Sequence, residues 1–192
     1  MARPFRVLGA TVAALSALSI LVFAQTSGQP ERFTASAVNM TSGGTGTLEI
    51  VVNRWSTDAE RNNLVQVLVN KGENSLLDAL QKTSKVGYIR NVNSIGWDLH
   101  YAHHQPLPDG GEQVVIATDR PMGFREVANQ WRTTDYPFTV IEMQLNADGE
   151  GQGTLSVATK VTVNKKTNTI ELENFGTSPV LLQNVKRERA TH

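Results

Sequence analysis

The chain has 192 residues, no cysteine, and 18 basic against 18 acidic side chains. The lack of cysteine excludes disulfide bonds, thiol redox chemistry and zinc–thiolate sites. The neutral charge balance disfavours nucleic acids and charged membrane surfaces as main partners, and the length is sufficient for one domain with its own core.

The first 24 residues have the pattern of a signal peptide. Arg3 and Arg6 form a basic start, and a nearly uncharged apolar run extends from Ala10 to Ala24. The run ends on a small residue and is short for a membrane span. We therefore expect export to the periplasm or the medium, with cleavage near Ala24–Gln25 and no stable membrane insertion afterwards. A retained single-pass anchor is the alternative.

The rest of the chain reads as one β-rich domain at 32–186, after a flexible leader at 25–31 and before a frayed, charged tail at 187–192. Alternation of apolar and polar residues between turn residues predicts nine strands. The expected strands are 33–40, 47–54, 86–91, 95–104, 113–119, 138–145, 155–163, 170–175 and 180–185.

Residues 57–82 are the exception and predict a pair of helices. Thr57 and Glu60 have the spacing of a capping box, Gly72 is placed to end the first helix, and Ser75 is placed to start the second. The apolar side chains of the pair are Leu64, Val67, Leu68, Leu76, Leu77 and Leu80. They form one apolar side, which we expect to lie on a sheet.

The predicted class is therefore mainly β (α+β). We expect a single antiparallel β-barrel or β-sandwich of about eight to nine strands, because successive hairpins form a meander and sheets of this number close or stack. The helical hairpin at 57–82 is an insertion that covers one opening or one face.

Two segments invite a metal interpretation, and neither supports it. His100, His103 and His104 lie close in sequence, but on one strand they point to different faces and cannot meet on a single ion. The segment 146–151 resembles the start of a calcium loop, yet the twelfth position is Val157 instead of a bidentate Glu. We expect a glycine-rich hairpin there, and we predict neither a metal nor a cofactor.

Known catalytic motifs are missing from the sequence. There is no Gly-x-Ser-x-Gly elbow, no P-loop, no dinucleotide fingerprint and no His-Glu-x-x-His. Catalysis is therefore the second hypothesis: a β-barrel enzyme, hydrolase-like or isomerase-like, that uses Glu142, Asp119 or His100 as acid or base.

Charged residues at predicted strand positions are the candidates for ligand binding. One hypothesis places Glu142 and Lys160 inside a barrel, where buried charges must be paired. The simpler alternative is an exposed cross-strand pair of these two residues. Tryptophans at 55, 97 and 131 could stack on a ligand or could belong to the core. The full candidate set is Arg54, Asp119, Arg120, Glu142, Lys160, Trp97 and His100.

Several segments resemble exported bacterial β-rich proteins that are themselves uncharacterised. The segments are Arg54–Arg61, Val86–Arg90, Ala117–Pro121, Asp135–Phe138 and Gly149–Gly151. The resemblance covers most of the mature chain and implies a bacterial exported protein, but it implies no activity, cofactor or catalytic residue. We therefore expect a non-enzymatic domain that binds a small molecule or an envelope protein, with the enzyme as the alternative.

Overall fold

The computed structural model describes residues 29–38, 44–91, 96–119, 138–158, 160–164, 169–173 and 179–188. This part of the chain forms ten strands and two helices. In chain order they are β1 (Glu31–Val38), β2 (Thr45–Val52), α1 (Asp58–Lys71), α2 (Glu73–Lys82), β3 (Gly87–Asn91), β4 (Trp97–Pro106), β5 (Glu112–Thr118), β6 (Phe138–Leu145), β7 (Glu150–Ala158), β8 (Lys160–Asn164), β9 (Thr169–Glu173) and β10 (Val180–Glu188).

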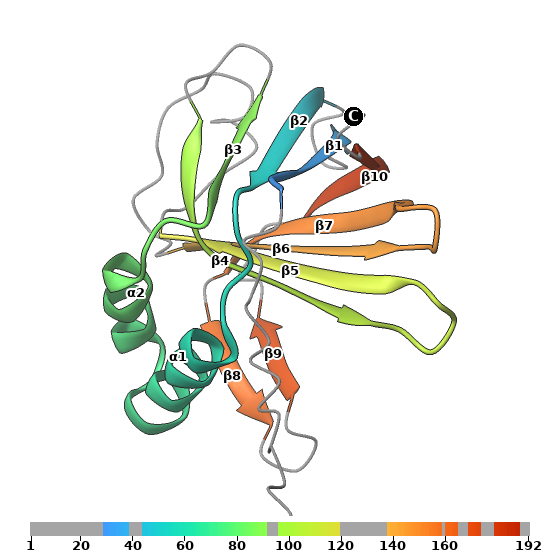
Figure 1. The fold of residues 1–192 in the computed structure, drawn as a ribbon. Coiled ribbons are helices and arrows are strands. Elements are labelled where there is room, and N and C mark those ends of the chain that lie inside the picture. Colours follow the sequence, from blue (N-terminus) through green and yellow to red (C-terminus); the bar gives the residue numbers. More distant parts are fainter. Residues whose placement is uncertain are drawn as a thin grey trace, which may run out of the picture.

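Eight of the strands close into a barrel in the order β1-β10-β7-β6-β5-β4-β3-β2 (Figure 1). Every neighbouring pair is antiparallel. The helices are inserted between β2 and β3, and β8 pairs with β9 in a separate two-stranded sheet. The mainly-β prediction with one helical insertion is confirmed, and the architecture is a barrel.

The interior of the barrel is a packed apolar core. Alternation along each strand directs one set of side chains inward, and an eight-stranded barrel is just narrow enough for side chains to fill it. Phe33, Ile89, Ile116 and Met143 are among the fully buried members, and Trp97 packs partly buried against them. Among the described residues, the buried polar side chains are those of Ser56, Thr118, Thr139 and Ser156.

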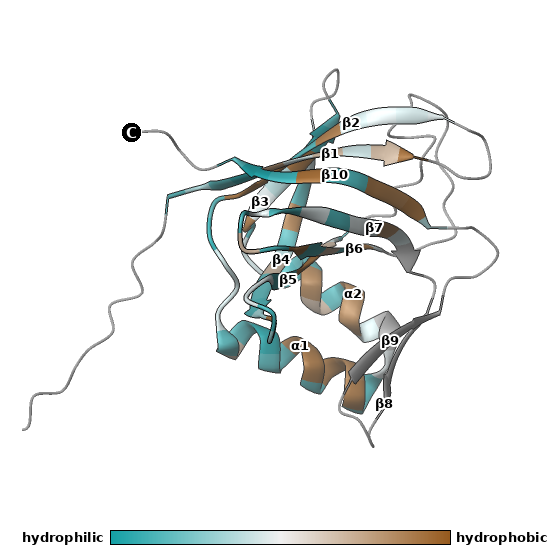
Figure 2. Ribbon diagram, turned by 90° about the vertical axis from the view of Figure 1, so that its right-hand side faces the viewer, coloured by the Kyte–Doolittle hydropathy of each residue, from teal (hydrophilic) through white to brown (hydrophobic). Residues whose placement is uncertain are grey.

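The two helices pack on the outside of the barrel wall. Thr57 and Glu60 form the predicted capping box at the start of α1, and Gly72, with φ of 81°, separates α1 from α2. A second apolar cluster joins the helices to the wall, and its buried members are Leu64, Leu68, Leu76, Leu80, Ala117 and Val140. Figure 2 shows both helices beside β4 and β5. The apolar run 114–117 is covered on both faces: Val114 and Ile116 belong to the barrel core, while Ala117 and the partly buried Val115 pack in the cluster under the helices.

Some predicted boundaries are wrong for identifiable reasons. The second helix begins at Glu73, directly after Gly72, and not at Ser75. The single strand expected at 155–163 is two strands, β7 and β8, and β7 already begins inside the expected glycine-rich connection. A Cβ at Gly151 or Gly153 would collide with a carbonyl oxygen of β6, so these glycines mark close contact between strands.

The ends of the barrel also differ from the predicted domain limits. β1 begins at Glu31, and β10 continues to Glu188, so Arg187 is part of the barrel wall instead of a frayed tail. None of the described helices combines the length and apolar character needed to cross a membrane. The predicted signal peptide and Trp131 lie outside the described residues.

Candidate functional site

Arg54 follows β2 and binds the start of α1. Its guanidinium donates hydrogen bonds to both carboxylate oxygens of Glu60, at 3.0 and 2.9 Å, and one to the Ser84 carbonyl at 3.3 Å. The bond from Arg54 is the largest cause that lowers the pKa of Glu60 from 4.5 to about 2; partial burial opposes it, and the Thr57 backbone N–H adds to it. Arg54 therefore holds a helix N-terminus in place.

His100 and Asp119 are two predicted site residues that the fold brings together. His100 Nε2 lies 3.8 Å from Asp119 Oδ1, and His100 Nδ1 lies 3.1 Å from the Thr83 carbonyl oxygen. Their side chains are only 14% and 20% exposed. The contact with Thr83 favours a proton on Nδ1, which leaves Nε2 facing the carboxylate.

Glu142 and Lys160 are not brought together. Glu142 is exposed on the outer face of β6 between Val115 and Thr154, so it does not line the interior, contrary to the first hypothesis. Lys160 lies on β8 opposite Glu173, so the alternative cross-strand pair is wrong as well. Trp97 packs against the barrel core, and Arg120 lies outside the described residues.

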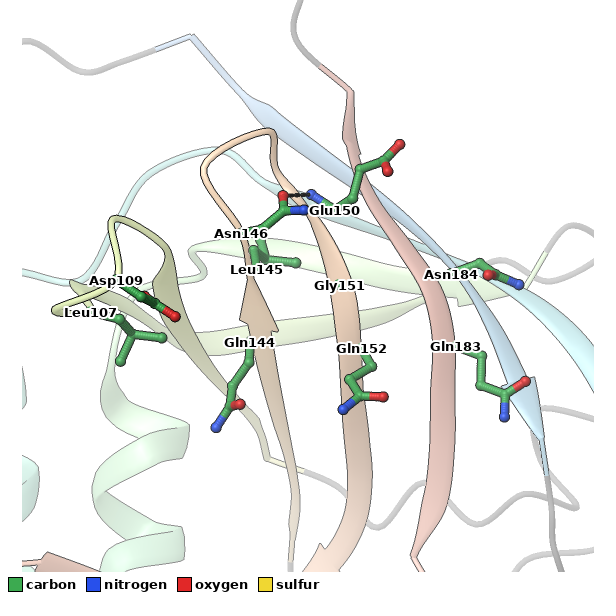
Figure 3. Close-up of a pocket in the computed structure, with 10 residues that line it drawn as sticks. All are labelled: Leu107, Asp109, Gln144, Leu145, Asn146, Glu150, Gly151, Gln152, Gln183 and Asn184. Atoms are coloured by element: carbon green, nitrogen blue, oxygen red, sulfur yellow. Dashed lines mark hydrogen bonds between the residues drawn. The ribbon is translucent and has the colours of Figure 1, made fainter.

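The outer wall of the barrel carries a groove that crosses β6, β7 and β10. Two hollows, of about 550 Å³ and about 330 Å³, share Gln144, Gln152 and Gln183 in their linings and form this groove. Figure 3 shows these three side chains side by side on neighbouring strands, with no hydrogen bond drawn between them. Leu107 and Asp109 lie at one end of the groove.

The three glutamines belong to a longer row. Strand register places Gln105 opposite Gln113, Gln113 opposite Gln144, and Gln144 opposite Gln152. Gln183 and Asn184, which are adjacent in β10, together oppose Gln152. We call these five side chains the glutamine row. Adjacent strands lie about 4.8 Å apart, so the row extends roughly 19 Å across five strands.

A β-bulge holds the end of the row in place. The register of β10 shifts between Leu182 and Val185, and Asn184 within this bulge has φ of 51°. Asparagine tolerates this left-handed conformation better than most residues. The bulge adds a residue opposite Gln152 and so sets where Gln183 and Asn184 line the groove.

The charges beside the groove are acidic. Its charged lining residues, among those described, are Asp109, Glu142 and Glu150, and Glu150 is paired with Lys186 at 3.0 Å. The glutamines themselves are neutral, and each amide both donates and accepts hydrogen bonds. The groove is therefore suited to a neutral polar partner and repels anions.

A second polar cluster lies across one mouth of the barrel, and we call it the mouth cluster. Arg187 forms ion pairs with Glu112 and, at 3.0 Å, with Glu31. His104 Nδ1 lies 3.1 Å from Glu112, and the Trp55 indole donates to Glu31 at 2.9 Å while its ring packs 4.3 Å from that of His104. The charges of Arg187, Glu31 and Glu112 are paired within the cluster, which indicates a structural role.

Sequence reasoning missed both the glutamine row and the mouth cluster. The available signal for the row was a glutamine at an outward position of several predicted strands, but only the register shows that they align. Among the described residues, no three His, Asp or Glu side chains could hold a metal ion. Comparison of the chain with protein-family models, with curated proteins and with solved structures finds no match.

Proposed function

We propose that the chain is an exported, non-enzymatic binding domain that holds a small polar ligand or an envelope protein on the outer wall of its barrel. The observation that carries the proposal is the groove over Gln144, Gln152 and Gln183. The packed apolar interior supports an external site, since its core is filled by side chains such as Phe33 and Met143. The signal-peptide pattern of residues 1–24 supports export.

The chemistry of the groove favours recognition over catalysis. Side-chain amides do not ionise at physiological pH, so they cannot serve as general acids or bases. They can hold hydrogen-bonding groups of either kind. Because each net hydrogen bond is worth only about 1 kcal/mol, a partner must engage several of them at once.

The test is native mass spectrometry of the mature protein purified from its own host. We expect a retained ligand or partner in the wild type and its loss in the triple variant Gln144→Ala/Gln152→Ala/Gln183→Ala. Gln81→Ala, which removes an exposed glutamine of α2 outside the groove, is the matched control. Equal retention by the triple variant would overturn the groove as the site.

The same spectra test export. If the measured mass is that of a chain that begins at Gln25, the result supports cleavage of the signal peptide. A membrane-bound chain that still contains residues 1–24 supports the anchor instead.

Acid–base catalysis is the second candidate function, and the 3.8 Å approach of His100 to Asp119 favours it. If the retained ligand changes mass on incubation with the wild type but not with His100→Gln, the domain is an enzyme. If neither the mass nor the NMR spectrum of the ligand changes with either protein, the binding function stands alone.

A further inference from the structure

We propose that the glutamine row binds a neutral, hydroxyl-rich chain, an oligosaccharide without ionised groups, laid across the barrel strands. This inference rests on the proposed binding function and names its ligand class. It follows from the spacing of the five amides, from their hydrogen-bonding state and from the charges of the residues beside the groove.

The spacing of the row favours a chain over a compact ligand. The amides repeat at the strand separation of about 4.8 Å, in five adjacent strands. A compact ligand would reach one or two of them. A chain with hydroxyl groups along its length can contact several at once, because a hydroxyl and an amide can each donate and accept.

The closed barrel disfavours an extended peptide as the occupant. A peptide usually joins a sheet by pairing with a free strand edge. All eight barrel strands are paired on both sides, so the barrel offers no such edge. Binding at the groove must therefore use the outward side chains.

The charges beside the groove select against anionic chains. Asp109 and Glu142 are acidic, and Glu150 is already paired with Lys186. Phosphorylated, sulfated or uronic-acid chains would bring like charges together, which is unfavourable. A neutral chain avoids this cost.

The five glutamines are not equivalent. Gln105 Nε2 already donates to Gln113 Oε1 at 2.7 Å, so part of the hydrogen-bonding capacity of this pair is used within the fold. The amides of Gln144, Gln152 and Gln183 are not joined to one another (Figure 3). We therefore expect these three to make the main contacts with the chain.

The experiment is an NMR titration of the mature protein that follows the side-chain NH₂ signals of the glutamines. The probes are cellohexaose and fully N-acetylated chitohexaose, their disaccharides, and an oligogalacturonate hexamer. We expect either neutral hexasaccharide to shift the signals of Gln144, Gln152 and Gln183, and to bind at least about fivefold more tightly than its disaccharide, because more amides are engaged. The oligogalacturonate should bind more weakly.

Variants separate the row from the rest of the surface. Gln152→Ala, at the centre of the groove, should weaken binding of the neutral hexasaccharide about fivefold to tenfold, corresponding to about one lost hydrogen bond. Gln81→Ala should leave it unchanged. Unchanged binding by Gln152→Ala would overturn the inference.

Three other results would also overturn it: no shift with either neutral hexasaccharide, tighter binding of a cationic glucosamine hexamer, or self-association of the protein that Gln152→Ala abolishes. If native mass spectrometry then still finds another partner lost in the triple variant, only the ligand class is wrong. If the triple variant retains every partner, the proposed groove function is wrong as well.

Discussion

At the mouth of the barrel, the Arg187 side chain contacts carboxylates from strands on opposite sides of the wall. Arg187 belongs to β10, next to the β1 strand that carries Glu31, whereas Glu112 belongs to β5, half-way around the ring. Its guanidinium carbon also lies 5.1 Å from the centroid of the ring of Phe33, a buried core residue. One side chain therefore ties together distant parts of the wall and covers the apolar interior.

We expect Arg187→Ala to lower the free energy of unfolding by about 2–4 kcal/mol, because two partly buried carboxylates lose the guanidinium that pairs with both of them. The control is Lys186→Ala, which removes an ion pair whose side chains are 60% and 56% exposed and should cost less than about 1 kcal/mol. Urea denaturation measures both. Equal losses in the two variants would show that the mouth cluster adds no more stability than an ordinary surface pair.

Glu60 makes stability depend on pH in the acid range. Its pKa in the folded chain is about 2, against an ordinary value of 4.5. Between these values the unfolded chain takes up a proton that the folded chain does not, so stability is full above about pH 4.5 and falls as the pH is lowered towards 2.

Glu60→Gln keeps a side chain that can complete the capping box but removes the charge that pairs with Arg54. We expect a loss of about 1 kcal/mol at neutral pH and a shallower dependence of the urea midpoint on pH between 4.5 and 2. The control is Glu188→Gln, which removes an exposed pair 3.6 Å from Arg32 and should cost less than about 1 kcal/mol at neutral pH. A Glu60→Gln curve parallel to the wild type would contradict the assignment.

At the scale of elements, the β4–β5–β6 wall separates two apolar clusters. Ile116 faces the barrel core, while its neighbour Ala117 packs under the helices. Leu80, which is 2% exposed, is the most buried helical member of the outer cluster. The helices are therefore held on the barrel wall by side-chain packing.

Leu80→Ala should destabilise the protein by about 2–4 kcal/mol, since it leaves a cavity between α2 and the wall. The partly buried Leu77 offers a comparison, and Leu77→Ala should cost less. Thermal unfolding followed by circular dichroism measures both. A smaller loss in Leu80→Ala than in Leu77→Ala would mean that the helices are not docked through Leu80.

Local patterns explain which elements could be predicted from the sequence. The strand at 138–145 was predicted with its observed limits because Ile141 and Met143 alternate with polar residues. The start of β7 was missed because Gly151 and Gly153 resemble loop residues until their close contact with β6 is known. The capping box at Thr57 was predictable because both of its partners lie within one turn.

The candidate site could not be predicted in the same way, because it depends on register. Gln113 and Gln144 are far apart in sequence and become neighbours only through the pairing of β5 with β6. Arg187 and Glu112 meet only because the barrel closes. The alternation of apolar and polar residues along a strand shows that such side chains point outward. It does not show which of them become neighbours across adjacent strands.

At the scale of the whole molecule, closure depends on β10, which joins β7 to β1. We expect a chain that ends at Pro179 not to fold, because it loses the buried Leu182 and Val185 and leaves two strand edges open. A chain that ends at Glu188 should fold like the wild type. Circular dichroism and size-exclusion chromatography measure the outcome, and a monomeric, folded chain without β10 would contradict the dependence on closure.

The pairing of Arg32 with Glu188 also sets the order of events during synthesis. The first barrel strand must wait for the last one before the ring is complete, so the native fold can form only after β10 has been synthesised. Such long-range pairing folds slowly, in milliseconds to seconds. For the export that we propose, late ring closure favours passage through a narrow translocation channel, because a chain in such a channel must be unfolded.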